Sequence, residues 1–354
     1  MKRSNPEIQI VRTLEELSQL ESRWDAVPPI WANPALSFDF VRSCAEAYQL
    51  ADRLAVFVST SGQSTAIAPL YRSETSSRLE LIGQNQIFEA SDFLYGAGDD
   101  ISLLARAVVA LGRPLRLTRV PAEAATVLAM TRACRGRALL IKRPATGCPW
   151  IALDAGWQEP DQQLNPGRRS DLRRARRIAE KLGEVRFDVC SPEPSELDAL
   201  LDEVYAVESA GWKSREGSAM ATDRRMGAFY KSFAAAACRK RILRLAFMRI
   251  NGQPVAAQLA VETGGSYWLL KIGYSEEFKR CSPGVLLVLE TLRYAAKAGL
   301  KFYEFLGTEE EWIGIWKPNL RACVRVQTYP FNWHGLRTLV GDALISFRVL
   351  RKEL

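Results

Sequence analysis

An internal repeat is the feature that most limits how this chain can fold. Residues 55–83 align with residues 245–273 at a constant offset, and within that alignment RLELIG matches WLLKIG. Each copy has the pattern of a strand, a glycine-containing turn, two more strands, a helix and a last strand, and Asn251-Gly252 is a strong hairpin signal. The repeat therefore predicts two similar α+β halves, each with helices packed on a mixed, mostly antiparallel sheet.

The size and composition of the chain allow two such domains. The 354 residues are 47% hydrophobic and 25% charged, which is ordinary for globular proteins long enough to form two cores. The stretch LNPGRRSDLRRARRIAEKLG starts with loop residues and continues as a basic helix, so the boundary is expected within residues 155–190. We expect a first domain at 1–160, a second at 161–335 and an amphipathic helix at 336–354.

Composition also excludes several classes of site. The seven cysteines form no CxxC pair, and the chain has one histidine, His334. Zinc sites, disulfide scaffolds and histidine-based triads are therefore not expected, and no metal is needed. The start of the chain shows no signal-peptide pattern and no apolar run reaches membrane-spanning length, so a cytoplasmic location is expected. The net charge of +8 fits an anionic cofactor, nucleic acid or an acidic membrane surface.

The segment KRCSPGVLLVLETL, residues 279–292, has the chemistry of an anion-binding loop. Ser282 is a suitable N-cap and Pro283 a suitable first residue for a helix that ends at Gly299. The first turn of such a helix offers backbone N–H groups and the positive end of its dipole, and Gly284 permits close approach. With Lys279 and Arg280 beside it, the loop suits a phosphate or pyrophosphate. A capped core helix with two solvated cations is the alternative.

The two halves of the repeat differ at this point. Where the second half has EEFKRCSPG, the first half has NQIFEASDFLYGAGDD, which is acidic and would repel phosphates. If one half binds an anionic cofactor, we expect it to be the second half, with the first half free of cofactor.

The second half also resembles a known family. The resemblance is carried by RRSDLRRARRIAEKLG (168–183), ESAGWK (208–213), NGQPVAAQLAV (251–261), YWLLKIGYSEEFKRCSPG (267–284) and FYEFLG (302–307). These segments are similar to GNAT-type acyltransferases of the BioF2-like and CelD group, which are related to the FemAB peptidoglycan aminoacyltransferases and carry two tandem GNAT-like domains. The resemblance implies an acyltransferase in which residues 279–284 (Lys279, Arg280, Cys281, Ser282, Pro283 and Gly284) hold the pyrophosphate of acyl-coenzyme A.

The resemblance implies transfer of the acyl group to an amine acceptor, with two alternatives. One is FemAB-like aminoacyl transfer from tRNA, and the other is a basic membrane or nucleic-acid adaptor without catalysis. Two departures concern the acceptor end of the site. This chain has Glu304 where the family commonly has Asp, and Trp312-Ile313 where a Tyr-Lys pair is common.

Four residues are candidates for catalysis: Glu304, Tyr274, Lys271 and Glu208. Glu304 follows a strand and could act as a base or amine anchor, Tyr274 could protonate the leaving thiolate, and Glu208 closes an upstream helix. Lys271 is a charge within an apolar strand. Exposed positions for Glu304 and Lys271 and a packing role for Tyr274 are the structural alternatives.

Five residues are candidates for substrate binding: Trp212, Lys213, Trp312, Trp316 and Lys317. The two tryptophan–lysine pairs fall where the resemblance implies acceptor contacts, although tryptophans are often packed and lysines solvated. Cys281 could also be an activated thiol at a helix N-terminus, but it has no histidine nearby to activate it.

Two basic amphipathic segments bear on partners. The helix at 168–183 carries Arg169, Arg173, Arg176 and Arg177, without the aromatic residues typical of nucleic-acid binding. In the C-terminal segment, Leu336, Leu339, Val340, Ala343, Leu344 and Phe347 form one helical stripe flanked by Arg and Lys. We expect a small-molecule or lipid amine as acceptor, no specific nucleic acid, and a C-terminal helix that either docks on the protein or contacts an anionic membrane.

Overall fold

A computed structural model describes residues 7–62, 64–74, 76, 78–211 and 223–350. The chain divides into two compact units, one made of residues 1–147 and 322–354 and the other of residues 148–321. This differs from the expected domains, because the first unit ends before residue 160 and the last part of the chain returns to it. Strands β6 (Ala138–Ala152) and β12 (Asn319–Pro330) each run from one unit into the other.

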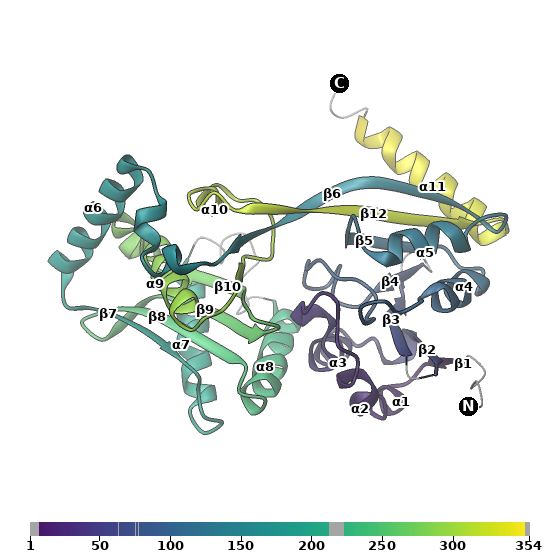
Figure 1. Cartoon of the computed structure of the whole chain (residues 1–354), viewed down its shortest axis with the longest axis horizontal. Helices are drawn as coiled ribbons and strands as arrows, with labels where there is room; N and C mark the ends of the chain where they lie inside the picture. The colour runs from purple at the N-terminus through teal and green to yellow at the C-terminus, as the bar shows by residue number, and fades with distance from the viewer. Residues whose placement is uncertain (1–6, 63, 75, 77, 212–222, 351–354) are drawn as a thin grey trace. The chain divides into compact units, whose positions relative to one another are not determined.

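The first unit is built on a sheet with strand order β1-β2-β3-β4-β5-β12-β6. Helices α4 and α5 pack on each other and share a core cluster with β2 to β5 and β12 (Figure 1). Its other elements are β1 (Glu7–Val11), α1 (Leu14–Ser18), α2 (Glu21–Asp25), α3 (Phe38–Ala47), β2 (Leu54–Ser61), β3 (Ser64–Arg72), β4 (Leu79–Leu81), α4 (Ser102–Ala110), β5 (Leu115–Pro121), α5 (Ala125–Ala133) and α11 (Trp333–Leu350).

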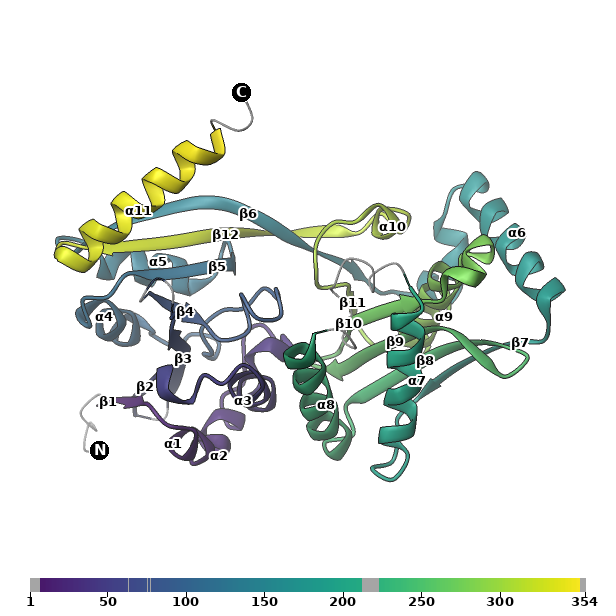
Figure 2. The same ribbon diagram turned by 180° about the vertical axis from the view of Figure 1, so that it is seen from behind.

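The second unit has the strand order β6-β11-β10-β9-β8-β7. Helices α6 and α9 share one core cluster with β8, β9 and β10, and α7 packs on β9 and β10 (Figures 1 and 2). Its elements are α6 (Pro166–Leu182), β7 (Val185–Cys190), α7 (Leu197–Ser209), α8 (Arg224–Arg239), β8 (Leu243–Ile250), β9 (Gln253–Thr263), β10 (Ser266–Tyr274), the 3-10 helix η6 (Glu276–Cys281), α9 (Pro283–Lys297), β11 (Phe302–Glu304) and α10 (Glu311–Gly314).

The predicted repeat is present in the strand pairing. In the first unit β2 pairs antiparallel with β3, β3 with β4, and β4 pairs parallel with β5; β8, β9, β10 and β11 repeat this scheme. In the β8–β9 hairpin Asn251 and Gly252 both have positive φ, 49° and 80°, as a type I′ turn requires. Each unit is thus the expected α+β arrangement of mostly antiparallel strands.

The long helix α9 is held by its apolar face. Leu286, Leu289 and Leu292 are buried with the inward residues of β8 and β9, and Thr291 satisfies its hydroxyl by bonding to Tyr303 and to the preceding helical turn. Burial of each leucine stabilises the unit by roughly 1.5–3 kcal/mol. The first turn of α9 is consequently fixed against the end of β10.

The first unit contains a buried acid, Asp92, whose protonation should affect stability. Burial raises the pKa of Asp92 from 3.8 to about 6, although hydrogen bonds from Thr126, Tyr95 and the Phe93 N–H oppose this. Because the folded-state pKa is the higher one, the contribution to stability is complete below the unfolded pKa and is lost as the pH rises through about 6.

We therefore expect Asp92→Asn to remove part of the pH dependence of unfolding. Between pH 5 and pH 7 the wild-type free energy of unfolding should fall by about 1 kcal/mol more than that of the variant, as follows from the two pKa values. Urea titrations of both proteins at the two pH values measure this difference. Parallel pH dependences would show that Asp92 does not titrate in this range.

Candidate active site

A pocket of about 230 Å³ lies within the second unit. The end of β10, the end of α7, the loop before α9 and the loop before α10 contribute its walls. Its lining residues are Glu208, Gly211, Ile272, Gly273, Tyr274, Lys279, Ser282, Pro283, Gly284, Val285, Glu310 and Trp312. The structure thus brings Glu208, Tyr274 and Trp312 together with the predicted anion-binding loop.

Three glycines allow the walls of this pocket to approach one another. A Cβ on Gly273 would lie 2.9 Å from the Cα of Glu208, and a Cβ on Gly211 would lie 2.9 Å from the carbonyl oxygen of Tyr274. A Cβ on Gly284 would lie 3.4 Å from Cδ1 of Tyr274. Tyr274 therefore lies between the loop before α9 and the end of α7.

Strand β10 separates from β11 beside the pocket. Their parallel pairing runs from Ser266–Phe302 to Trp268–Glu304, whereas β10 continues to Tyr274. A bulge between Leu269 and Lys271 on the β9 side changes the register at the same point. Ile272 and Gly273, which lie beyond the end of the β11 pairing, line the pocket.

The loop before α9 forms the expected helix start with a different cap. Ser282 is the N-cap residue, but it has a positive φ of 46° and its side chain makes no capping hydrogen bond. Its carbonyl oxygen accepts from the N–H groups of Val285 and Leu286. The predictions of Ser282 as the N-cap residue and of proline at the first helical position are both confirmed, although the Ser282 side chain does not cap the helix. Pro283 has no N–H, so the first turn presents the N–H of Gly284 and the positive end of the α9 dipole.

The three residues before Ser282 differ in their relation to the pocket. Lys279 and Arg280 are both exposed, and Lys279 lines the pocket while Arg280 is not among its lining residues. Cys281 is fully buried, its Sγ donates to the carbonyl oxygen of Phe278, and burial raises the pKa of its thiol. The hypothesis that Cys281 is an activated thiol is therefore wrong, and its side chain is part of the core of the second unit.

The carboxylate of Glu208 is buried beside the pocket, with Lys271 as its cationic partner. Glu208 is 2% exposed and lies at the end of α7. The Nζ of Lys271 is 3.9 Å from its Oε1, 3.5 Å from Sδ of Met226 and 5.3 Å from the ring centre of Tyr230. Lys271 is thus neither a solvated lysine nor a lining residue, but a counter-charge behind Glu208.

Glu304 has a different environment from the one predicted. Its carboxylate forms two hydrogen bonds with Arg321, Nη1 to Oε2 at 2.8 Å and Nη2 to Oε1 at 2.7 Å, and the guanidinium lies 5.7 Å from the ring centre of Trp150. Both carboxylate oxygens are occupied and the side chain is not among the pocket-lining residues. The structure therefore assigns Glu304 to an ion pair that joins β11 to β12.

Removing the cation of this pair should destabilise the second unit. Arg321→Met leaves the buried Glu304 carboxylate without its bidentate partner, and we expect the free energy of unfolding to fall by about 2–3 kcal/mol. Urea unfolding measures the loss, and combining Arg321→Met with Glu304→Gln should recover part of it because the orphaned charge is gone. A loss below about 0.5 kcal/mol would mean that the pair is as weak as an exposed one.

The predicted substrate-binding residues separate into three groups. Trp312 lines the pocket and donates its indole N–H to Glu310 at 2.7 Å. Trp316 is buried in the core and Lys317 is exposed, and neither is among the lining residues. Trp212 and Lys213 lie outside the described residues.

Sequence reasoning missed several lining residues. Gly211, Ile272, Gly273, Val285 and Glu310 line the pocket without having been proposed for it. Ile272 and Gly273 carried a signal, because they match Ile82 and Gly83 in the repeat. Glu310 is one of three consecutive glutamates, and its sequence context does not distinguish it from its neighbours.

In the repeat, the start of α4 in the first unit corresponds to the start of α9 in the second unit. Asp100 accepts a hydrogen bond from the N–H of Ser102 in the first turn of α4 at 2.8 Å. Hydrogen bonds from the side chain and the N–H of Ser102 hold the pKa of Asp100 below its ordinary value. The N-terminus of α4 therefore already has an anion bound to its first turn.

In the described part of the chain, no group of three or more His, Cys, Asp or Glu side chains is arranged to hold a metal ion. None of the described helices has the length and apolarity needed to cross a bilayer.

Residues 166–313 match the family model of the acetyltransferase (GNAT) domain. The C-terminal domain of a putative lysylphosphatidylglycerol synthetase from Agrobacterium fabrum has a similar structure, with a TM-score of 0.61 and 14% identity over 93% of this chain and 96% of that one. L-PGS from Bacillus licheniformis (0.56, 12%, 96% and 99%) and FemX (0.56, 11%, 92% and 98%) are also similar. These likenesses show a shared fold. No curated protein sequence matches the chain.

Proposed function

We propose that this chain, whose residues 166–313 form a GNAT acetyltransferase domain, transfers an acyl group from acyl-coenzyme A to a primary amine. The observation that carries the proposal is the pocket itself, in which the first turn of α9 and the carboxylate of Glu208 border one space. The helix start suits the anionic part of a donor, and the carboxylate suits a cationic acceptor.

The residues present fit a coenzyme A thioester. Lys279 and the N–H of Gly284 at the start of α9 would face its pyrophosphate, and the missing side chain of Gly284 permits close approach. The separated end of β10 offers backbone groups beside the pocket to an extended pantetheine arm. The fixed dipole of α9 favours negative charge there without rearrangement.

The side chains of the pocket can manage the protons of the reaction. The bound ammonium first releases one proton to solvent; the neutral amine nitrogen then attacks the thioester carbon, a C–N bond forms, the C–S bond breaks, and the thiolate leaves. Glu208 would accept the proton that the amine loses, and Tyr274 would supply a proton to the sulfur. Lys271 is the counter-charge of Glu208, and Glu310 with Trp312 offers a second carboxylate and a ring to the ammonium acceptor.

Aminoacyl transfer from tRNA is the second candidate. Helix α6 packs against η6 and α9, and its exposed Arg168, Arg173, Arg174 and Arg177 form a cationic surface on the same unit as the pocket. The structural likeness to FemX and to lysylphosphatidylglycerol synthetases is compatible with this donor. The surface is not interleaved with aromatic side chains, which favours coenzyme A over single-stranded nucleic acid.

Calorimetric titration distinguishes the donors. The proposal expects one coenzyme A to bind per chain, with thiol release from acetyl-coenzyme A that depends on an added primary amine. Two equivalent coenzyme A sites would contradict the expectation of one site per chain. No binding of coenzyme A together with salt-sensitive binding of tRNA would replace the proposal by the second candidate. Binding of neither donor would remove both.

A further inference from the structure

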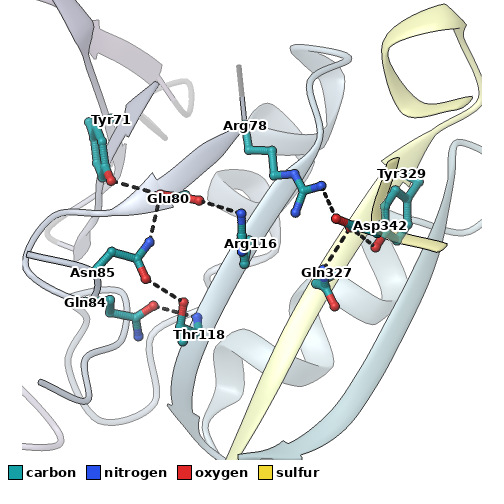
Figure 3. A network of polar contacts seen from close by, with 10 residues as sticks. All are labelled: Tyr71, Arg78, Glu80, Gln84, Asn85, Arg116, Thr118, Gln327, Tyr329 and Asp342. Carbon is teal, nitrogen blue, oxygen red and sulfur yellow. Dashed lines mark hydrogen bonds and ion pairs between the residues drawn. The ribbon is translucent and has the colours of Figure 1, made fainter. Parts of the chain in front are cut away.

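Helix α11 of the first unit has one face fixed to the protein and the other exposed. Asp342 on the inner face forms an ion pair with Arg78 and accepts hydrogen bonds from Tyr329 at 2.6 Å and Gln327 at 3.2 Å (Figure 3). Burial raises the pKa of Asp342, but the bonds from Arg78 and Tyr329 outweigh it and the net shift is downward. A charged anchor therefore sets the rotation of the helix about its axis.

The outer face of α11 is apolar. Trp333, Leu336, Val340 and Leu344 are 71%, 55%, 50% and 56% exposed, and their spacing of three or four residues places them along one side of the helix. The prediction that the helix docks on the protein thus holds for one face only. An apolar helical stripe of this length left open to solvent is typical of a binding surface.

A groove of about 320 Å³ lies beside the helix in the same unit. Its walls combine three arginines with apolar side chains: Arg116, Ile141, Arg143, Arg325, Gln327, Tyr329, Leu339, Asp342, Ala343 and Ile345. Arg116 is paired with Glu80 at 3.2 Å and Asp342 with Arg78. Arg143 and Arg325 are exposed and have no ion-pair partner in the described part of the chain.

The exposed charged side chains around the groove are positive. The segment 138–147 has Lys142 and Arg143 and no acid, and the part of β12 in this unit has Arg325 and no acid. The described part of α11 has one acid, Asp342, which is turned inward and neutralised. Two copies meeting through this face would bring like charges together, so charge complementarity favours an anionic partner over a second copy.

We propose that the outer face of α11 and the adjoining groove bind an anionic membrane surface. Trp333, Leu336, Val340 and Leu344 enter the headgroup layer, while Arg143 and Arg325 contact lipid phosphates. The arrangement has the features of an interfacial helix: an apolar stripe, flanking cations and an aromatic residue at one end. Because the helix is already fixed by Asp342, membrane contact requires no folding of the segment.

Vesicle sedimentation tests this surface. Wild-type protein should sediment with phosphatidylcholine vesicles containing about 30 mol% phosphatidylglycerol at about 0.1 M salt, and not with pure phosphatidylcholine. The triple variant Leu336→Glu, Val340→Glu and Leu344→Glu should bind at least about tenfold more weakly. Leu128→Glu, which alters a leucine of α5 that is 54% exposed, is the matched control and should bind like wild type.

A double variant of the two exposed arginines tests the cationic part of the surface. Arg143→Ala with Arg325→Ala should weaken binding roughly 30-fold, since each cation near an anionic surface contributes about 1 kcal/mol. Arg106→Ala with Arg132→Ala removes the same charge from exposed positions of α4 and α5 and should have little effect.

Four outcomes would overturn the proposal. The first is wild-type protein that does not sediment with anionic vesicles, and the second is an unchanged triple variant. The third is loss of vesicle binding in millimolar inorganic phosphate at constant ionic strength, which would identify the groove as a site for a soluble anion. The fourth is a wild-type dimer that the triple variant converts to monomer in size-exclusion chromatography, which would assign the face to a second copy.

Discussion

Replacing Glu208 by glutamine is expected to lower kcat by about 100- to 1,000-fold, since a proton acceptor in the transition state contributes on this scale. Glutamine has the shape of glutamate and fits where Gly273 packs against residue 208, so the pocket should keep its form. It cannot take the proton that the amine loses. Thiol release from acetyl-coenzyme A, with the primary amine that gives the highest wild-type rate in a panel, measures the effect.

A double variant tests whether Glu208 acts as the base or only neutralises the charge of Lys271. If Glu208 serves only to neutralise Lys271, then Glu208→Gln combined with Lys271→Met removes both charges and should restore the rate. If Glu208 is the base, the double variant stays inactive. Coenzyme A affinity should remain within about threefold of wild type in both variants, since neither side chain faces the donor phosphates in the proposed arrangement.

Glu310, the second carboxylate of the pocket, tests whether the base role belongs to residue 208. Glu310 lines the same pocket but is exposed and bonded to Trp312. Glu310→Gln should raise KM for the amine with little change in kcat, as expected for a group that binds the acceptor without taking its proton. A kcat loss equal to that of Glu208→Gln would give the base role to Glu310.

The local elements of this fold could be predicted because their signals are local. Two or three adjacent residues are enough to predict the positive-φ turn at Asn251-Gly252 and the proline at the start of α9. The internal alignment then allowed the same elements to be predicted for both halves. The return of residues 322–354 to the first unit could not be predicted, because it depends on β12 pairing with β5, about 200 residues away in sequence.

In the site, too, local features could be predicted from the sequence and long-range contacts could not. The helix-starting loop was visible as a motif, whereas the roles of the acids depend on partners that spacing does not reveal. Arg321 takes Glu304 into an ion pair, and Lys271 faces Glu208 from a strand 63 positions later by their residue numbers. A buried carboxylate beside a pocket and a carboxylate in a bidentate pair look alike in sequence. Only packing distinguishes them.

Gly284→Val should raise the Kd for coenzyme A by about 100-fold, equivalent to about 2.7 kcal/mol. A Cβ at this position would be 3.4 Å from Tyr274 and 3.8 Å from Ile272, so alanine can be accommodated, whereas the two further methyl groups of valine must occupy the donor path or displace Tyr274. Calorimetric titration with coenzyme A measures the change, and Gly284→Ala should cost at most about tenfold.

Two controls make this prediction specific to the pocket. Gly341→Val introduces the same β-branched residue into α11 at a glycine whose Cβ would meet nothing within 4 Å, and it should leave Kd unchanged. Lys279→Ala should weaken binding more than Arg280→Ala, because Lys279 lines the pocket and Arg280 does not. If Gly284→Val binds coenzyme A like wild type, the donor does not pass the start of α9. If Arg280→Ala has the larger effect, the phosphates lie outside the pocket, along the exposed side of η6, and the donor enters from that side.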